Sequence, residues 1–399
     1  MQDYQDFKNV KESVKIEDVV SSYIALKPSG ANRVGCCPFH NEKSASFTVS
    51  PAKQIFSCFG CGVSGDVIKF VELYENIKPV QAMTKIANTY GVHIEDRSRP
   101  DLDAADDPFL INKAAAKAFV ANFSNADREV KRWLVSRGIN SKELLAKWDL
   151  GLATWDAPLS YSQELQKTLG LLNQNGKCPF GGRLMFGLKD FMGRYVGFAG
   201  RALSESKAKY INSQESEVFK KKTFLYGECY AAKSIKQAES AIIVEGYFDV
   251  INMHAVGYEN TVGTCGTSLT VEHAKAIAKR ANFAFLFLDG DMWKEEKMHI
   301  LEKALLTLWS QGIGVVLLKP PIDSDPADMA LTYGDQAIGA CQKVTAAEFL
   351  KLRGFSLEQA AKALKQLKGN VMHANQVRND ICLLYGCSII LLNRLVRQM

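Results

Sequence analysis

Three cysteines and a histidine within one short segment have the spacing of metal ligands. Two residues separate Cys37 from His40, two separate Cys58 from Cys61, and 17 residues lie between the two pairs. A hairpin that brings such loops together places four thiolate and imidazole ligands in a tetrahedron, which suits Zn²⁺. Four protein ligands leave no open position, so we expect a structural zinc that stabilises a small domain. Cys36 could replace Cys37, although the spacing favours Cys37.

Alternating residues between the two pairs predict a hairpin of the zinc-ribbon type. The segments 46–50 and 53–58 alternate, and Pro51 interrupts them. Aromatic and basic residues also occur here, namely Phe39, Phe47, Phe56, Phe59, Lys43 and Lys53. These side chains could stack bases and hold phosphates, or the rings could form the core of a small domain. Both interpretations stay open at the level of sequence.

Carboxylates follow three apolar segments of buried-strand type farther along the chain. They are Glu245 after AIIV, Asp289 and Asp291 in FAFLFLDGD, and Asp323 and Asp325 after GVVLLKPPI. Sites in parallel sheets form at the carboxyl ends of the strands, and residues i and i+2 of an extended segment project the same way. Because clustered carboxylates repel one another without cations, we expect one or two Mg²⁺ or Mn²⁺ ions. Helix capping could explain one or two of these acids, but not the whole set.

Basic and aromatic residues are interleaved over residues 201–227. They are Arg201, Lys207, Lys209, Lys220, Lys221, Lys222, Tyr210, Phe219, Phe224 and Tyr226. Lysines beside carboxylate-bound metals would complete a binding site for phosphates. The ordinary interpretation of the triple lysine alone is a solvated surface.

Periodicity and composition predict a multi-domain α/β (α+β) protein. Helical segments alternate with the short apolar strands between residues 240 and 318, which indicates a parallel sheet. Residues 95–107 are acidic and contain Pro100 but no aromatic residue, as in a solvated linker. We therefore expect a zinc-binding domain (1–94), a linker (95–107), a mixed α/β subdomain (108–238), a parallel-sheet subdomain (239–334) and a helical segment (335–399).

Bulk composition is that of a folded protein with a local basic excess. Of the 399 residues, 47% are hydrophobic and 23% are charged, which is ordinary for soluble domains. Residues 181–236 contain 11 Lys and Arg against 5 Asp and Glu, so a polyanionic partner is expected there. No stretch reaches the roughly 18 apolar residues of a membrane span, and the polar start lacks a signal-peptide core. We expect a cytoplasmic location without membrane contact.

In motif order and over nearly its whole length, the chain resembles bacterial DnaG-type DNA primases. CPFHNEKSASFTVSPAKQIFSCFGCGVSGD is similar to the zinc-binding domain of that family, and IIVEGYFDVI and LDGD resemble its TOPRIM fold. RLMFGLKDFMGRYVGFAGR and KYINSQESEVFKKKTFLYG resemble the basic motifs of its RNA polymerase domain. The resemblance implies zinc ligands Cys37, His40, Cys58 and Cys61, metal ligands Glu245, Asp289, Asp291 and Asp325, and groove residues Arg201, Lys209, Asn212 and Lys221.

Three features depart from the pattern of that family. MetTrpLys at 292–294 stands where a small residue and glycine commonly open the next helix. In place of a third D-x-D pair, Asp325 is followed by Ala327, so Asp328 is left as a group that could support the ligands. The chain stops about where the polymerase domain ends, so we expect the C-terminal helicase-binding domain to be absent, as in a shortened phage or mobile-element member.

The resemblance implies synthesis of short RNA primers on single-stranded DNA from ribonucleoside triphosphates. Glu245, Asp289 and Asp291 with Lys209 and Lys221 are the expected catalytic residues. The residues expected to bind nucleic acid or nucleotide are Arg201, Lys209, Tyr210, Asn212 and Lys221. The zinc ribbon is expected to engage template DNA, and a replicative helicase is a further candidate partner. The alternatives are a TOPRIM nuclease or topoisomerase and a zinc-ribbon replisome adaptor without catalysis.

Overall fold

The computed structural model describes most of the chain and divides it into two compact units. The described residues are 2–40, 42, 44–75, 77, 79–92, 107–123, 126–155, 162–204, 208–266, 268–321, 323–367 and 371–398. Unit 1 is Met1–Leu102 and unit 2 is Asp103–Met399. The linker expected at 95–107 lies outside the described residues except for its last position.

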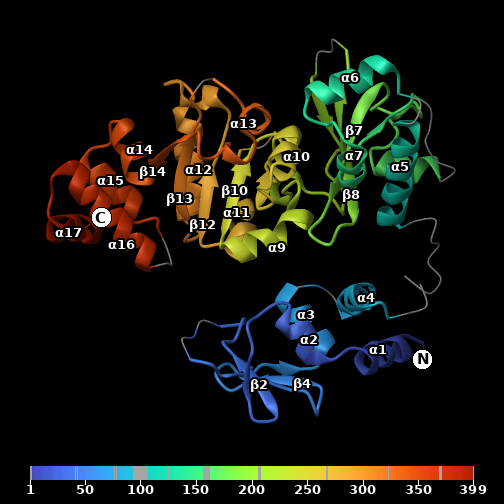
Figure 1. The fold of residues 1–399 in the computed structure, drawn as a ribbon, viewed down its shortest axis with the longest axis horizontal. Helices are drawn as coiled ribbons and strands as arrows, with labels where there is room; N and C mark the ends of the chain where they lie inside the picture. Colours follow the sequence, from blue (N-terminus) through green and yellow to red (C-terminus); the bar gives the residue numbers. More distant parts are fainter. Residues whose placement is uncertain are drawn as a thin grey trace. The chain divides into compact units, whose positions relative to one another are not determined.

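The described residues of unit 1 form a five-stranded antiparallel sheet and four helices, drawn in blue in Figure 1. Its strands follow in sequence order: β1 (Lys27–Ser29), β2 (Asn32–Gly35), β3 (Phe47–Ser50), β4 (Ile55–Cys58) and β5 (Ser64–Gly65). The helices are α1 (Gln2–Ser13), α2 (Ile16–Ser21), α3 (Val67–Glu75) and α4 (Pro79–Tyr90). Phe47 and Phe56 stack with ring centroids 5.2 Å apart, and Phe70 of α3 packs edge-on against both. The hairpin predicted from alternation is therefore β3 and β4, with its aromatic face buried under α3.

The first of the two sheets of unit 2 is antiparallel and has four strands. Its order is β6 (Gly151–Leu152), β7 (Arg183–Lys189), β8 (Tyr195–Ala202) and β9 (Tyr210–Asn212). The helices of this part are α5 (Pro108–Asn122), α6 (Arg128–Ser136), α7 (Lys142–Lys147) and α8 (Gln163–Thr168). The side chains of Asp107, Asp127 and Ser141 each accept a hydrogen bond from a backbone amide in the first turn of α5, α6 and α7.

The second sheet of unit 2 is the predicted parallel sheet. Its order is β11 (Thr261–Gly263), β10 (Ser240–Val244), β12 (Phe283–Leu286), β13 (Gly314–Lys319) and β14 (Gln342–Thr345). The first four strands are parallel, and β14 pairs antiparallel with β13. Residues 335–399, expected to be helical throughout, therefore also supply the edge strand β14 to this sheet.

Helices cover both faces of the parallel sheet, which is why its strands are continuous apolar runs. On one face, Ile243, Leu286 and Leu317 share a core with α9 (Glu228–Ala238), α11 (Val271–Ala278), α12 (Met298–Trp309) and α14 (Ala346–Leu352). On the other face, Ile242 and Val244 share a core with α10 (Tyr247–Ala255), α13 (Pro326–Tyr333) and the antiparallel sheet. The two sheets of unit 2 are thus joined by one buried layer.

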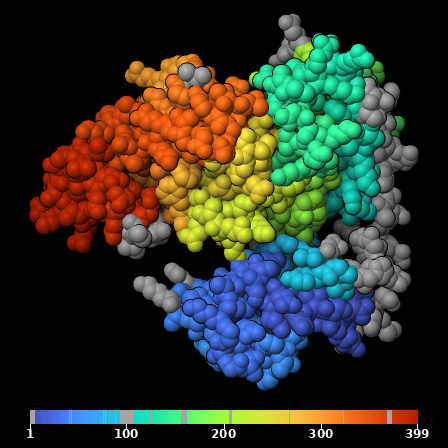
Figure 2. Space-filling view, viewed as in Figure 1, coloured from blue at the N-terminus to red at the C-terminus, as the bar shows by residue number. Residues whose placement is uncertain are grey.

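Beyond β14, three further helices follow α14 at the red end of unit 2 in Figures 1 and 2. They are α15 (Leu357–Leu364), α16 (Val371–Tyr385) and α17 (Ile389–Gln398). Within the described ranges, no single helix has the length and apolar character to cross a membrane, and α16 with α17 meets that test only as a pair bent by 110°.

Candidate functional site

The carboxyl ends of β10, β12 and β13 bring three predicted acids to one edge of the parallel sheet. Glu245 directly follows β10, and the backbone amide of Asp289 donates a hydrogen bond to Glu245 Oε1 across 3.4 Å. Asp325 caps the N-terminus of α13, where its Oδ1 accepts a hydrogen bond from the Asp328 amide at 2.7 Å. The parallel sheet predicted from the sequence therefore accounts for the convergence of these residues.

A close backbone contact holds the two acidic loops together. The Gly290 amide donates to the Ser324 carbonyl at 2.9 Å, and a Cβ on Gly290 would lie 2.8 Å from the Ser324 amide nitrogen. Any larger side chain at position 290 would push the loop containing Asp289 away from the loop containing Asp325. Glycine here is thus a requirement of the site.

The extended segment predicted for Asp289 and Asp291 is wrong. Strand β12 ends at Leu286, and Gly290–Trp293 forms the 3-10 helix η4. Asp291 forms an ion pair with Lys297, and its other carboxylate oxygen is buried without a hydrogen-bond partner among the described residues. The apolar run of the sequence could not reveal this turn, because the run continues through Phe287 and Leu288.

Burial raises the pKa of the converging acids, and repulsion from neighbouring carboxylates adds to it at Asp289. Burial, followed by the charges of Glu245, Asp325 and Asp291, raises the pKa of Asp289 to about 7. Burial also raises the pKa of Glu245 and of Asp325. The chemistry of the donors suits a hard divalent cation. In the described part of the chain, only the Cys/His set below has its ligand atoms closely gathered, so these carboxylates share an edge without meeting at one point.

Asp249 is a buried acid of this region that the sequence interpretation missed. Its two carboxylate oxygens accept hydrogen bonds from the amides of Gly246 at 2.7 Å and Ala327 at 3.3 Å. Burial, with the nearby charges of Asp325 and Asp289, raises its pKa well above the ordinary value. Its position three residues after Gly246, at the start of α10, was the available signal, since acids there cap helices.

Besides Lys297, Arg137 and Lys209 act on the acidic edge, and Arg137 was not predicted. The positive charges of Arg137 and Lys209 oppose the burial that raises the pKa of Asp325, and Lys209 acts likewise on Asp289. Lys209 is exposed just before β9, as expected for a groove residue. Arg137 caps α6, and its carbonyl accepts a hydrogen bond from Asn252 of α10 at 3.0 Å. No spacing in the sequence singled out Arg137, because a contact between distant segments places it.

A cavity of about 370 Å³ opens beside Glu245. Its walls include Thr264 and Gly266 of the loop after β11, and α12 contributes Lys303. A Cβ on Gly266 would lie 3.9 Å from Lys221 Nζ, which places the predicted Lys221 next to this loop. Glu245 and Lys221 are therefore both close to the cavity.

Arg201 and Asn212 are engaged within the protein. Arg201 is only 8% exposed; its Nη1 donates to the Tyr210 hydroxyl at 2.7 Å, and its guanidinium lies over the rings of Trp133, Tyr210 and Phe248. Burial raises the pKa of Tyr210 to about 12. Asn212 Oδ1 accepts a hydrogen bond from the Tyr247 hydroxyl at 2.6 Å. The structure therefore places Arg201 as a support for Tyr210, with little surface left for phosphates.

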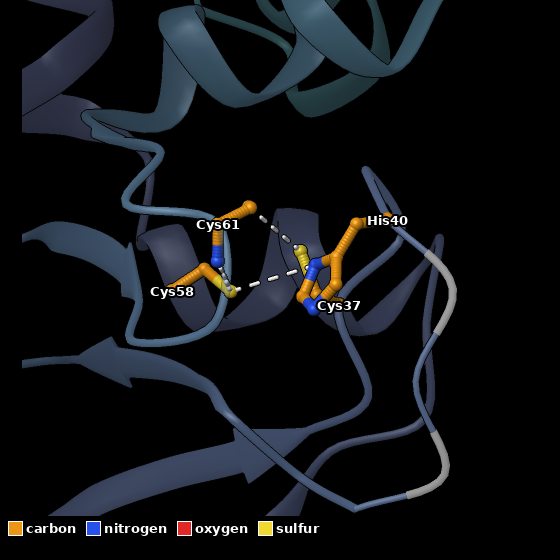
Figure 3. A group of neighbouring side chains, drawn as sticks. All are labelled: Cys37, His40, Cys58 and Cys61. Atoms are coloured by element: carbon orange, nitrogen blue, oxygen red, sulfur yellow. Dashed lines mark hydrogen bonds between the residues drawn. The ribbon is translucent and has the colours of Figure 1, made fainter.

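The predicted zinc ligands form one cluster in unit 1 (Figure 3). One ligand atom from each of Cys37, His40, Cys58 and Cys61 lies within 4.8 Å of all the others. Cys37 Sγ is 3.8 Å from Cys61 Sγ, and Cys58 Sγ is 3.8 Å from His40 Nδ1. Cys36 is exposed and outside the set, so the geometry selects Cys37. Three thiols and an imidazole in this arrangement fit a tetrahedral zinc ion.

Glu42 organises this cluster and was not predicted. Its Oε2 lies 3.2 Å from His40 Nε2, and its Oε1 accepts a hydrogen bond from the Cys37 amide at 2.6 Å. Burial works against ionisation of Cys58, but hydrogen bonds from Ser46 and from the amides of Cys61 and Gly60 outweigh it and lower the pKa of Cys58 to about 6. The site thus favours thiolate at Cys58 and turns His40 Nδ1 towards the thiols.

Three family models match consecutive parts of the chain. They are the CHC2 zinc finger over residues 3–101, the N-terminal domain of the DNA primase catalytic core over 119–232, and the Toprim domain over 239–306. The zinc-finger match and the Cys/His cluster support zinc, and the Toprim match implies a divalent cation.

Curated relatives and solved structures give the same result. The DNA primase of Clostridium acetobutylicum is 34% identical over 349 residues, which cover 83% of this chain and 57% of the relative. That of Aquifex aeolicus is 34% identical over 84% of this chain and 68% of the relative. A crystal structure of the zinc-binding and RNA polymerase domains of the Aquifex aeolicus primase matches with a TM-score of 0.60 and 30% identity, covering 97% of this chain and 98% of that one. The chain thus spans roughly three fifths of the curated relatives, and it belongs to the DnaG-type DNA primase family.

Proposed function

We propose that this protein synthesises short RNA primers on single-stranded DNA by metal-dependent nucleotidyl transfer. The observation that carries the proposal is the convergence of Glu245, Asp289 and Asp325 on one sheet edge, beside Lys209. Family membership supports the same activity.

In this proposal, Glu245, Asp289, Asp291 and Asp325 hold Mg²⁺ or Mn²⁺. Such ions, when bound, neutralise triphosphate charge and favour ionisation of an attacking hydroxyl. Ion binding requires Asp289 to lose its proton, which its pKa of about 7 permits near neutrality. Lys297 pairs with Asp291 in the present arrangement, so it is expected to release that carboxylate as a cation enters.

The basic residues have two different roles in the proposal. Lys209 is exposed beside the acids and Lys221 adjoins the cavity next to Glu245, so both are placed to hold phosphates of the nucleotide or the template. Arg137, which acts on Asp325 electrostatically, is a further phosphate contact in this scheme. Arg201 contributes indirectly, because it fixes the hydroxyl of Tyr210.

The zinc ribbon has a structural role and a template-binding role in this scheme. Cys37, His40, Cys58 and Cys61 are the proposed zinc ligands, and Glu42 orients the imidazole of His40. Because all four positions come from protein, the ion holds the fold of unit 1 and takes no part in the reaction.

The test is primer synthesis on single-stranded DNA with ribonucleotides and Mg²⁺ or Mn²⁺. Wild-type protein is expected to make labelled oligoribonucleotides, and Asp289→Ala to lose at least about 100-fold in rate. Asp380→Ala is the matched control, because Asp380 lies on α16 and accepts an exposed hydrogen bond from Gln376 of the same helix. Nicked or relaxed DNA would instead indicate a strand-breaking enzyme, and binding without any product would indicate an adaptor.

A further inference from the structure

The side chain of Asn212 has one polar atom engaged and the other free. Asn212 is the last residue of β9, and its Oδ1 accepts a hydrogen bond from the Tyr247 hydroxyl at 2.6 Å. Its amide nitrogen Nδ2 makes no hydrogen bond within the described part of the chain, and it is not one of the buried polar atoms that lack a partner there. Nδ2 of this half-buried residue therefore reaches solvent.

The contact with Tyr247 fixes which way this amide faces. The oxygen and the NH₂ group of an asparagine have nearly the same shape, so hydrogen-bond partners decide their orientation. Because the Tyr247 hydroxyl donates to Oδ1, the carbonyl of Asn212 faces inward and its NH₂ group faces outward. The outward group is an uncharged donor, which suits an acceptor such as a phosphate oxygen.

Tyr247 is itself held firmly by aromatic side chains. It is buried, and its ring stacks on Phe186 of β7 with the ring centroids 4.9 Å apart. Tyr226 lies edge-on to the same ring at 4.9 Å, and Tyr210 of β9 packs against it at 5.5 Å. A side chain packed by three rings keeps its hydroxyl in one place, so the orientation of Asn212 is set before a ligand binds.

Tyr247 also connects Asn212 with the acidic edge. Tyr247 begins α10, two residues after Glu245, whereas Asn212 belongs to the antiparallel sheet. Their hydrogen bond therefore joins the loop that carries Glu245 to strand β9. Lys209, three residues before Asn212, acts electrostatically on Asp289. One short segment thus offers a charged and an uncharged donor beside these acids.

We propose that Tyr247 is a positioning residue that turns the NH₂ group of Asn212 towards the phosphates of a bound ribonucleotide. This inference rests on the proposed function for the choice of a ribonucleoside triphosphate as the ligand. A donor without charge holds a phosphate oxygen and does not compete with a divalent cation for Glu245 or Asp289. A lysine at this position would compete, as the ion pair of Lys297 with Asp291 illustrates.

The experiment measures binding of ATP with Mg²⁺ to the full chain without DNA, by isothermal titration calorimetry. Asn212→Ala is expected to weaken binding about tenfold, the effect of losing a hydrogen bond to a charged group. Tyr247→Phe keeps the ring but releases the amide, so Oδ1 can turn outward and repel a phosphate. This variant is expected to weaken binding by about fivefold.

Tyr258→Phe is the matched control for the loss of a hydroxyl group. The Tyr258 hydroxyl donates to the Asp335 carbonyl at 2.6 Å, near the opposite end of α10 from Tyr247. Its removal should leave the affinity for ATP unchanged. Thermal unfolding of each variant identifies any loss of fold.

Asn212→Asp separates this role from a purely structural one. The aspartate can accept the hydrogen bond of Tyr247 with one oxygen, but it presents a charged acceptor where the NH₂ group was. If Asn212 only supported Tyr247, this variant would bind ATP as the wild type does. In our proposal it binds ATP more weakly than Asn212→Ala, and an affinity equal to that of the wild type would overturn the inference.

A double variant tests whether Tyr247 acts through Asn212. Tyr247→Phe combined with Asn212→Ala should bind ATP as Asn212→Ala alone does, whereas additive losses would contradict the proposal. Inorganic triphosphate with Mg²⁺ should show the same relative losses as ATP. Losses confined to ATP would place the contact at the ribose or the base and would overturn the assignment to phosphate.

Primer synthesis separates this inference from the proposed function. If Asp289→Ala abolishes synthesis while Tyr247→Phe and Asn212→Asp bind ATP normally, the inference fails and the proposed function stands. If the wild type makes no primers yet both variants weaken ATP binding as expected, the proposed function fails and the inference stands.

Discussion

The amide of Asp289 donates a hydrogen bond to Glu245 Oε1 across 3.4 Å, although the two residues are 44 positions apart in the chain. Glu245 follows β10 and Asp289 follows β12, two parallel neighbours in the sheet. If these residues had faced opposite sides of the molecule, no common metal site would exist. Their proximity is therefore the relationship on which the catalytic proposal depends.

We predict that Asp289→Asn stabilises the metal-free protein at pH 8. The pKa of Asp289 is raised from 3.8 to about 7, so the native state favours the protonated form and the wild type loses stability as pH rises from about 4 to 7. The asparagine side chain cannot ionise, so the variant escapes this loss of stability. Each tenfold change in proton affinity corresponds to about 1.4 kcal/mol, and we take half of the free energy that the pKa shift implies. The variant should therefore be more stable than the wild type by about 2 kcal/mol at pH 8. Thermal unfolding in a chelator measures the difference.

The control for this experiment is Asp323→Asn. Asp323 is exposed and forms a 2.7 Å ion pair with Lys294, so its replacement should change stability by no more than about 0.5 kcal/mol. The gain in stability of the Asp289→Asn variant should vanish near pH 4. A gain that persists at pH 4 would show that its cause is not the titration of this carboxyl.

We predict that zinc removal unfolds unit 1 and leaves unit 2 folded. The four ligands lie in the β2–β3 loop and at the end of β4. Loss of the zinc ion should therefore expose the backbone amides of the β3–β4 hairpin to hydrogen exchange. All five tryptophans are in unit 2, at positions 133, 148, 155, 293 and 309, so their emission should hardly change. Cys58→Ser should reproduce the effect of a chelator.

Cys36→Ser is the matched control for the zinc prediction. Cys36 adjoins Cys37 but is exposed and outside the cluster. The Cys36→Ser variant should bind zinc as the wild type does. Loss of zinc in Cys36→Ser with retention in Cys37→Ser would instead assign the ligand to Cys36.

The main elements of the fold were predictable because their signals are local. Parallel strands buried on both faces are apolar runs, which identified β10, β12 and β13. The short strands β11 and β14 have no such signal, since QKVT contains only one large apolar residue. β11 and β14 are defined by their pairing with strands that are distant in the chain, and the periodicity of a sequence carries no information on such pairing.

Candidate ligands could be predicted where a local pattern of the sequence marks them. The spacing of the cysteines and His40 selected the zinc cluster, and strand ends selected Glu245, Asp289 and Asp325. Glu42, Asp249 and Arg137 were missed because each acts through a contact that depends on the fold. The resemblance implies that Arg201 is a groove residue that binds phosphates, and its burial against three aromatic rings is not visible in the sequence.

We predict that Glu42→Gln weakens zinc binding by about 10- to 100-fold, the usual effect of losing a group that orients a ligand. The amide keeps the shape of the side chain but lacks the charge that faces His40 Nε2 at 3.2 Å. Competition with a chromophoric chelator measures the affinity. Glu12→Gln, which removes only an exposed partner of Lys8, should leave it unchanged. Equal affinity in both variants would show that Glu42 does not support the site.

We predict that Gly138→Ala destabilises unit 2 and reduces primer synthesis. Gly138 has φ of 85°, and a Cβ there would lie 1.9 Å from Asn252 Oδ1. Asn252 also holds the Arg137 carbonyl at 3.0 Å, so the clash should displace Arg137 from Asp325. The left-handed backbone alone should cost about 1–3 kcal/mol, and the clash should add to it. Gly354→Ala is the matched control, because Gly354 has φ of 73° with no atom within 4 Å of the added Cβ. It should show the backbone cost without the loss of synthesis, and equal losses in the two variants would mean that the contact with Asn252 does not position Arg137.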